Sequence, residues 1–290
     1  MDAASVKPLV SGFYDKPTGA MQYVVTDPVT RRCAIIDPVL DFDEKSGATA
    51  TTNADALLDF IAREGLDVEW ILDTHPHADH FSAAHYLKQK TGAPTAIGER
   101  VVDVQKLWTA IYNWPDFPSD GRQWDRLFGE GEVFSIGRLP VKVLFSPGHT
   151  LASITYVVGD AAFVHDTLFM PDSGTARCDF PGGSASRLWG SLQGILALPD
   201  HTRVFVGHDY QAGGREPRWE STVGEQKASN IHLVAARTEA EFVALREARD
   251  RTLPMPRLML HALQININGG RLPEPEANGR RYLKFPLDAL

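Results

Sequence analysis

Residues 73–80 read DTHPHADH and place three histidines and two aspartates directly after the apolar run VEWIL at residues 68–72. A protein that buries such groups must give each of them a hydrogen-bond partner, an opposite charge or a metal ion. Neutral imidazole is the commonest biological metal ligand. Pro76 limits the freedom of the loop between the first two histidines, so less conformational entropy is lost when a metal binds. The stretch therefore indicates a metal site just beyond a buried strand.

The same pattern of polar residues at the end of an apolar run returns three times later in the chain. These segments are SPGHT at 146–150, HDT at 165–167 and GHD at 207–209. Sites in α/β folds gather beyond the carboxyl ends of strands, so we expect the four segments to converge. A single His-x-His pair is more often ordinary surface chemistry than a metal site. For the four segments together, chance is a poor explanation of so many histidines and aspartates at strand ends.

Apolar periodicity predicts an α/β fold with mixed sheets covered by helices. Runs rich in β-branched residues predict strands, including a hairpin, and apolar residues at helical spacing predict helices. The expected strands include 21–27, 31–38, 68–74, 139–148, 152–160, 161–166 and 202–209, and the expected helices 51–65, 81–92, 185–198 and 239–251. We predict a catalytic domain over residues 1–220. Residues 221–290 are expected to form a C-terminal extension packed on it, helical at first and then Pro-rich and extended from Leu253.

Composition narrows the class of protein. The chain has 290 residues, 43% of them hydrophobic, and a formal net charge of −8, which argues against a general nucleic-acid or anionic-membrane surface. Two distant cysteines, Cys33 and Cys178, form no disulfide framework and suit a reducing compartment. The first residues lack the long apolar stretch of a signal peptide. We expect a soluble cytoplasmic protein with no nucleic-acid or membrane partner.

The ordered motifs resemble those of the metallo-β-lactamase fold superfamily. THPHADH resembles its signature, and SPGHT, HDTLF and VGHDY are similar to its later motifs, across roughly residues 15–215. The resemblance implies an αββα sandwich with the metal site at one edge of the two sheets.

Within that superfamily, RCDF at residues 177–180 resembles the Arg-x-Asp-Phe element of persulfide dioxygenases, the family of ethylmalonic encephalopathy protein 1. IIDPVLDFDEKSG and HDYQAGGREPRWEST also look like bacterial members. The resemblance implies oxidation of glutathione persulfide by O₂ to sulfite and glutathione at one Fe(II) per chain. It implies His75, His149 and Asp166 as the metal ligands. The residues expected to surround these ligands and orient them are His77, Asp79, His80 and His208.

Two other hypotheses about the function stay open. In a glyoxalase II-like thiolester hydrolase the same residues would bind two zinc ions directly. A non-catalytic metal-binding scaffold is the third hypothesis, and the complete set of ligand motifs argues against it. The oligomeric state stays open too, with a homodimer among the alternatives.

Substrate handling is assigned to residues around the later motifs. The residues expected to act on the substrate are Asp79, Tyr210 and Arg177 in catalysis, and Arg177, Tyr210, Arg215 and Arg218 in binding. For Arg215 and Arg218, a role as solvated surface residues is an equal alternative. Arg177 would orient a substrate carboxylate or pair with Asp179. His165 stands where the superfamily commonly has glycine. Strand alternation predicts that its ring points away from Asp166 as a harmless substitution, although at a strand end the ring could instead bend into the site. Cys178 is expected to be structural, since nothing nearby identifies it as activated.

Overall fold

The computed structural model describes residues 7–288, which form two six-stranded sheets, a small third sheet and eight α-helices. The first sheet has the order β1 (Leu9–Asp15), β2 (Ala20–Thr26), β3 (Arg32–Ile36), β6 (Asp67–Leu72), β8 (Thr95–Gly98), β9 (Arg126–Phe128). The second has the order β10 (Val133–Ile136), β11 (Leu139–Phe145), β12 (Ile154–Val158), β13 (Ala161–His165), β14 (Arg203–Val206), β15 (Glu220–Thr222). The third consists of β5 (Ala48–Ala50), β4 (Val39–Asp43) and β7 (Phe81–Ser82).

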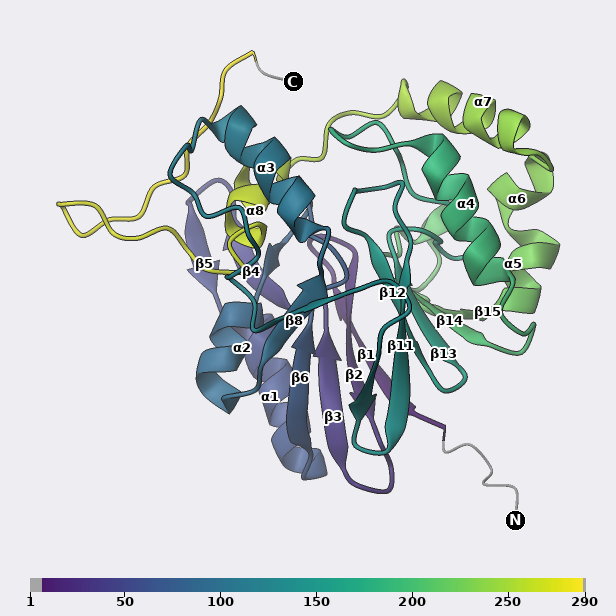
Figure 1. The fold of residues 1–290 in the computed structure, drawn as a ribbon, viewed down its shortest axis with the longest axis horizontal. Coiled ribbons are helices and arrows are strands. Elements are labelled where there is room, and N and C mark those ends of the chain that lie inside the picture. Colours follow the sequence, from purple (N-terminus) through teal and green to yellow (C-terminus); the bar gives the residue numbers. More distant parts are fainter. Residues whose placement is uncertain (1–6, 289–290) are drawn as a thin grey trace.

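The helices lie on the outer faces of the two large sheets (Figure 1). On the side of the first sheet are α1 (Thr52–Glu64), α2 (Ala84–Thr91), α3 (Val101–Tyr112) and α8 (Met259–Asn266). On the side of the second are α4 (Ala185–Leu196), α5 (Val223–Ser229), α6 (Ile231–Ala235) and α7 (Glu239–Asp250). This arrangement confirms the predicted αββα sandwich with mixed sheets.

Strand β13 shows how the sequence builds the sandwich. Ala161 and Phe163 belong to the core between the sheets, whereas Ala162 and Val164 pack under the helices of the outer layer. Successive side chains of a strand point to opposite faces, so an uninterrupted apolar run is what a strand buried on both faces needs. Because β13 pairs in parallel with β14, the polar residues that follow both strands emerge at one edge.

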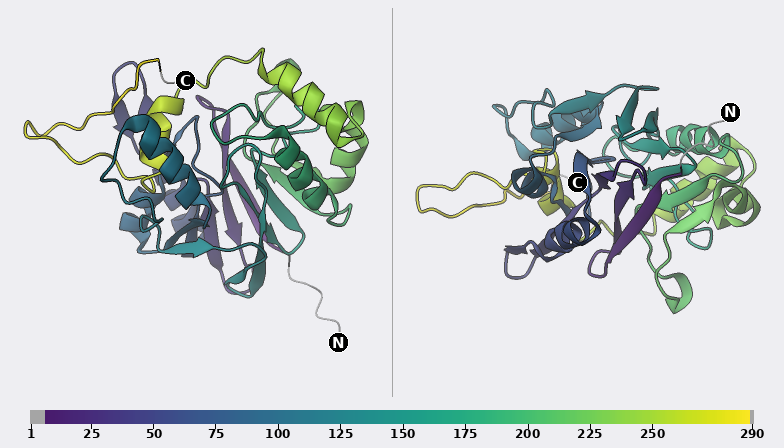
Figure 2. Two further views of the ribbon diagram at one scale, coloured as in Figure 1. Left: turned by 45° about the horizontal axis from the view of Figure 1, so that its top comes forward. Right: turned by 90° about the horizontal axis from the view of Figure 1, so that it is seen from below.

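The C-terminal extension differs from the prediction in one element. The helices α5, α6 and α7 confirm the helical texture expected from residue 221, but the expected extended tail contains α8. Met259, Ala262 and Ile265 of this helix are buried and pack against α1, α2 and α3. The prediction was wrong there because Pro254 and Pro256 masked a short apolar helix that begins just beyond them. The residues after α8 project from the body as a loop (Figures 1 and 2).

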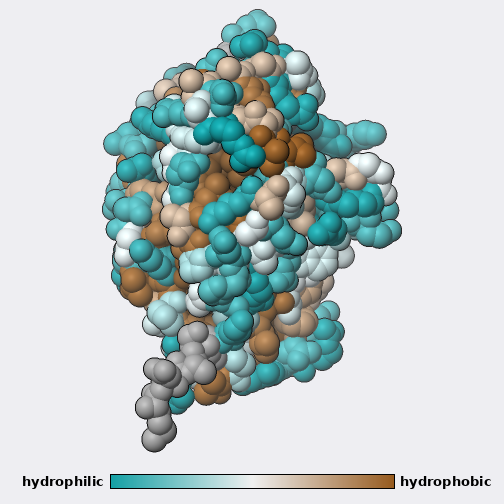
Figure 3. Space-filling model, turned by 90° about the vertical axis from the view of Figure 1, so that its right-hand side faces the viewer, coloured by the Kyte–Doolittle hydropathy of each residue, from teal (hydrophilic) through white to brown (hydrophobic). Residues whose placement is uncertain are grey.

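The outer face of the second helical layer is largely solvated. Hydrophilic residues dominate this side of the molecule, and apolar residues gather in the upper part of the view (Figure 3). Among residues 7–288, none of the helices combines the length and apolarity that crossing a bilayer requires.

Candidate metal centre

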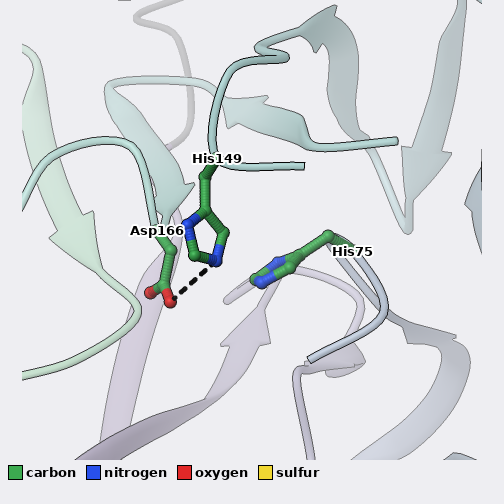
Figure 4. A group of neighbouring side chains, drawn as sticks. All are labelled: His75, His149 and Asp166. Atoms are coloured by element: carbon green, nitrogen blue, oxygen red, sulfur yellow. Dashed lines mark ion pairs between the residues drawn. The ribbon is translucent and has the colours of Figure 1, made fainter. Parts of the chain in front are cut away.

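The three residues expected to hold a metal lie together, although they come from three separate loops. His75 lies on the loop after β6, His149 on the loop between β11 and β12, and Asp166 directly after β13. The three side chains are buried and point toward one another (Figure 4), and each can offer a ligand atom within 4.8 Å of the others. The Nε2 atom of His149 is 3.6 Å from Oδ2 of Asp166.

The buried nitrogen atoms of this group fit a metal ion. The Nε2 atom of His75 has no hydrogen-bond partner among the described residues, which is costly for a buried polar atom unless a metal occupies the position. Burial lowers the pKa of His75 well below its usual range, so the ring is in the neutral form that metals bind. The Nδ1–H of His149 donates to the Arg177 carbonyl at 2.9 Å and leaves Nε2 on the side of Asp166. A hydrogen bond from the ring nitrogen that does not bind the metal fixes the orientation of a ligating histidine.

The second histidine of the loop is held by a carboxylate that we did not predict. Nε2 of His77 donates to Asp37 at 3.0 Å. Asp37 also accepts the backbone N–H and the hydroxyl of Thr74, each at 2.7 Å. The sequence contains a sign of this role, because Asp37 in the segment IIDP (residues 35–38) directly follows an apolar run that predicts a strand. One nitrogen of His77 is therefore committed to the protein itself.

A second hydrogen-bonded group adjoins the first and shares Asp166. Nδ1 of His208 donates to Asp166 at 2.6 Å, and Nε2 of His208 makes a hydrogen bond to Asp79. Burial alone would lower the pKa of His208, but the Asp166 and Asp79 carboxylates raise it well above its usual range. The Tyr210 ring is stacked on His208, with centroids 5.6 Å apart and planes 7° from parallel. His80 is buried nearby, and burial lowers its pKa to about 4.

His165 bends into the site, the alternative considered for a residue at a strand end, and does not point away from it as the favoured expectation had it. Its backbone has a φ of 42°, and its ring lies 5.1 Å from the ring of His75. Its Nε2 makes hydrogen bonds with the hydroxyls of Ser146 at 2.9 Å and Thr167 at 3.0 Å. The left-handed backbone turns the end of β13 and places the ring beside that of His75, so His165 is part of the support of the site.

The buried thiol of Cys178 lies in the core of the second helical layer. Burial raises its pKa, which disfavours the thiolate that nucleophilic chemistry needs. Its backbone N–H donates to Asp250 at 2.8 Å. These contacts agree with the structural role expected of this cysteine.

A cavity of about 590 Å³ opens onto Asp79, His149 and Asp166, and the predicted substrate residues Arg177 and Tyr210 line it. The Arg177 side chain is held on both sides. It makes two hydrogen bonds of 2.7 Å to Asp179 and donates to the Pro254 carbonyl at 2.6 Å. The expected pairing with Asp179 is therefore formed. The same side chain also ties the C-terminal extension to the wall of the cavity.

Two other predicted substrate residues lie away from the lining of this cavity. Arg215 pairs with Asp172 at 2.6 Å and with Asp209 at 2.5 Å. The backbone N–H of Arg218 donates to the same Asp209 at 2.6 Å. Neither arginine is among the residues that line the cavity. The ion pairs with Asp172 and Asp209 make Arg215 a structural support of the loop after β14. The cluster of basic residues in the sequence did not reveal this role.

Asn266, at the end of α8, holds the loop of residues 73–80 in place, and this role was not predicted from the sequence. Its Nδ2 donates to the carbonyls of His77 and His80, both at 2.7 Å, and its Oδ1 accepts the N–H of Ser82 at 2.8 Å. The side chain is 2% exposed. No local pattern predicts this contact, because the partners lie 184 or more residues apart in the chain.

Comparison with known proteins places this geometry in a family. Residues 16–208 match the family model described as Metallo-beta-lactamase superfamily. The chain belongs to the metallo-β-lactamase superfamily. The superfamily motifs identified in the sequence are thus confirmed, and the buried histidine and aspartate groups are consistent with a metal site of this kind.

Among curated members of the superfamily, the chain is 72% identical to the "Beta-lactamase hydrolase-like protein" of Xylella fastidiosa, over 98% of this chain and 65% of that protein. The chain thus spans only about two thirds of the length of this relative. It is 46% identical to "Glyoxylase B2" of Dictyostelium discoideum, over 99% of both chains. Among solved structures, ETHE1 from Myxococcus xanthus is 29% identical, with a TM-score of 0.73 over 91% of this chain and 100% of that one.

We predict that His75→Ala abolishes metal binding, because it removes one of three ligands in the buried group. His80→Ala should leave much of the metal in place, since the loss of a residue that only supports the ligands typically costs about 10–100-fold in affinity or activity. Elemental analysis of anaerobically purified wild type and both variants tests this. Two metals per wild-type chain, with one lost in His80→Ala, would contradict a single-metal centre.

We predict that Asn266→Ala weakens metal binding by about tenfold or more while the fold is kept. The substitution leaves two buried carbonyls and one N–H without partners, at about 1–3 kcal/mol each, so the loop loses its fixed shape. Chelator competition measures the affinity, and circular dichroism checks the fold. Asn268→Ala is the control, because the side chain of Asn268 donates to the Arg271 carbonyl at 3.3 Å and not to the loop of residues 73–80. Equal affinities in wild type and Asn266→Ala would show that these hydrogen bonds have no effect on the metal.

Proposed function

We propose that the chain is an enzyme, a persulfide dioxygenase that converts glutathione persulfide, O₂ and water into glutathione, sulfite and protons. The sulfane sulfur is oxidised in this reaction and O₂ is reduced. The observation that carries the proposal is the group of His75, His149 and Asp166, in which two imidazoles and one carboxylate offer ligand atoms within 4.8 Å of one another.

Two histidines and one carboxylate are a set that can hold one redox-active metal. Both nitrogens of His208 are engaged by Asp79 and Asp166. Nδ1 of His77 and Nδ1 of His80, however, are buried without a hydrogen-bond partner among the described residues, and a dinuclear hydrolase would use such histidines as direct ligands. Fe(II) held by two histidines and one carboxylate would supply redox chemistry toward O₂ and keep positions open for sulfur.

The side chains around the ligands would orient the substrate and exclude water. Phe180 packs edge-on against His149 with centroids 5.0 Å apart, and it lines the cavity together with Phe169 and Tyr210. Desolvation alone would raise the pKa of Asp79, but His208 and His80 hold it well below its usual range. Asp79 therefore stays a carboxylate that can orient groups in the cavity and is a weak proton acceptor.

The likeness to ETHE1 over the full length of that chain supports this proposal. A glyoxalase II-like thiolester hydrolase is the second candidate. The names of the Xylella and Dictyostelium relatives favour this second candidate more than the first. Asp79, Asp166 and His208 also offer ligand atoms within 4.8 Å of one another, as a second metal would require.

We predict that iron-loaded protein consumes O₂ when glutathione persulfide is added and does not when glutathione alone is added. Only the persulfide carries the sulfane sulfur that is oxidised. An oxygen electrode measures the uptake, and sulfite is quantified in the same samples. Rapid hydrolysis of a glutathione thiolester without O₂ uptake would establish the second candidate instead.

We predict that Arg177→Ala lowers kcat/KM for the persulfide by about tenfold and leaves the iron content unchanged. The Arg177 carbonyl supports His149, and this backbone contact survives the truncation of the side chain. Steady-state kinetics and iron analysis of the same preparation provide the measurement. Arg177→Lys should recover little, because an ammonium group cannot replace the two parallel bonds to Asp179. If iron is lost together with activity, Arg177 is needed for the metal centre itself.

A further inference from the structure

The segment that follows α8 leaves the body of the protein and then returns to it (Figures 1 and 2). We call residues 272–284 the arm. Both of its ends are fixed, because Leu272 and Leu283 pack against the core that α1 and α2 cover. Between these ends, every residue of the stretch 274–282 is exposed. The arm therefore projects into solvent from a fixed base.

The arm is folded although it buries little of its own chain. At its tip, the Glu276 N–H donates to the Arg280 carbonyl at 2.8 Å, and the Gly279 N–H donates to the Glu276 carbonyl at 2.7 Å. The Asn278 amide donates to the Tyr282 hydroxyl at 2.6 Å. Ordering a segment costs conformational entropy, which burial of apolar surface normally offsets. We therefore expect the arm to make its burying contacts with another molecule.

The exposed side chains of the arm combine positive charge with apolar surface. Arg280 and Arg281 are adjacent on the returning limb, and in the described part of the chain neither lies within 4 Å of a carboxylate. Tyr282 follows them and is 48% exposed, and Phe285 at the base is 44% exposed. The chain as a whole has a formal net charge of −8. The basic arm is thus complementary in charge to the protein that carries it.

A surface with matching properties lies on the third sheet. Strand β5 pairs with β4 on one side only, and its three residues are exposed. Its sequence, Ala-Thr-Ala, contains neither the charged residues nor the proline with which natural sheets protect an edge strand. A groove of about 250 Å³ adjoins β5, and Phe42, Phe81, Asp41 and Asp43 are among the residues that line it. The groove therefore presents aromatic rings and carboxylates together.

The base of the arm is joined to this groove by a row of aromatic rings. Phe81 is stacked on Phe42 with centroids 4.3 Å apart. The His261 ring lies 5.5 Å from Phe42 and 4.6 Å from Phe285. The arm thus leaves the protein beside the third sheet (Figure 1). In a two-fold symmetric dimer the same patch of both copies meets, so a projecting element and the surface that receives it must lie on one side of each copy. This arrangement meets that requirement.

We propose that the arm binds a second copy of this chain, and that each copy places its arm along β5 and over the adjoining groove of the other. The arginines of the arm pair with Asp41 and Asp43, Tyr282 enters the groove, and the returning limb continues the sheet beyond β5. Thr18 lines both this groove and the metal cavity, and His80 lines the groove. Each arm therefore covers a surface next to the candidate metal centre of the other copy.

Sedimentation velocity of the full chain tests the role of the arm. Wild type should be a dimer that dissociates more readily as the salt concentration is raised. Arg280→Glu combined with Arg281→Glu should weaken the dimer by about tenfold or more, because the two-fold axis repeats each lost ion pair. The matched control is Arg187→Glu combined with Arg237→Glu, which reverses two exposed arginines of the second helical layer and should leave the dimer unchanged.

The receiving surface is tested with single-cysteine variants, since both native cysteines are buried. A mixture of Thr49→Cys and Tyr282→Cys should form a disulfide between the two different chains under mild oxidation, and neither variant alone should do so. Asp43→Asn should also weaken the dimer, because it removes a negative charge and keeps the oxygen that accepts the Lys45 N–H.

Three results would overturn the proposal. The first is a wild type that stays monomeric at every concentration tested. The second is a dimer that Arg280→Glu combined with Arg281→Glu leaves as tight as wild type, which would place the interface on another face. The third is a Tyr282→Cys variant that cross-links to itself and not to Thr49→Cys, which would show that the arms meet each other and not the third sheet. Circular dichroism checks that each variant keeps the fold.

Discussion

The carboxylate of Asp37 is the contact on which the metal loop depends. Asp37 follows β3 and accepts three hydrogen bonds from the loop that follows the neighbouring parallel strand β6. Its φ of 50° is in the left-handed region, which aspartate tolerates better than most residues. The turn aims the carboxylate across the strand end at Thr74 and His77. The loop is therefore held by two side chains, Asp37 after β3 and Asn266 at the end of α8.

Sequence patterns could predict that His75, His149 and Asp166 lie together because each follows an apolar run, whereas the resemblance to the superfamily implied their role as ligands. The run before His75 had to be a buried strand, and polar residues at its end had to lie at the sheet edge. The same reasoning holds for His149 and Asp166. The supporting contacts could not be predicted in this way. Asn266 reaches the loop from 189 residues away, and its helix α8 was hidden by the prolines before it. Such contacts depend on tertiary packing, which no local periodicity encodes.

The number of metals depends on which nitrogens of the motif histidines are free to bind one. His208 lies between Asp79 and Asp166 and bonds to both, so a metal bound by His208 would have to displace one of these bonds. His77 differs, because Asp37 engages its Nε2 while its Nδ1 is buried without a partner among the described residues. The same set of residue types therefore offers ligand atoms for one metal or for two.

The extension contributes both to the loop of residues 73–80 and to the cavity. Asn266 at the end of α8 holds the loop that carries His75, while Arg249 on α7 lines the cavity. The Arg177 side chain donates to the Pro254 carbonyl, so the segment between α7 and α8 is tied to the wall of the cavity. The extension therefore helps to fix the shape of the cavity beside the candidate metal ligands.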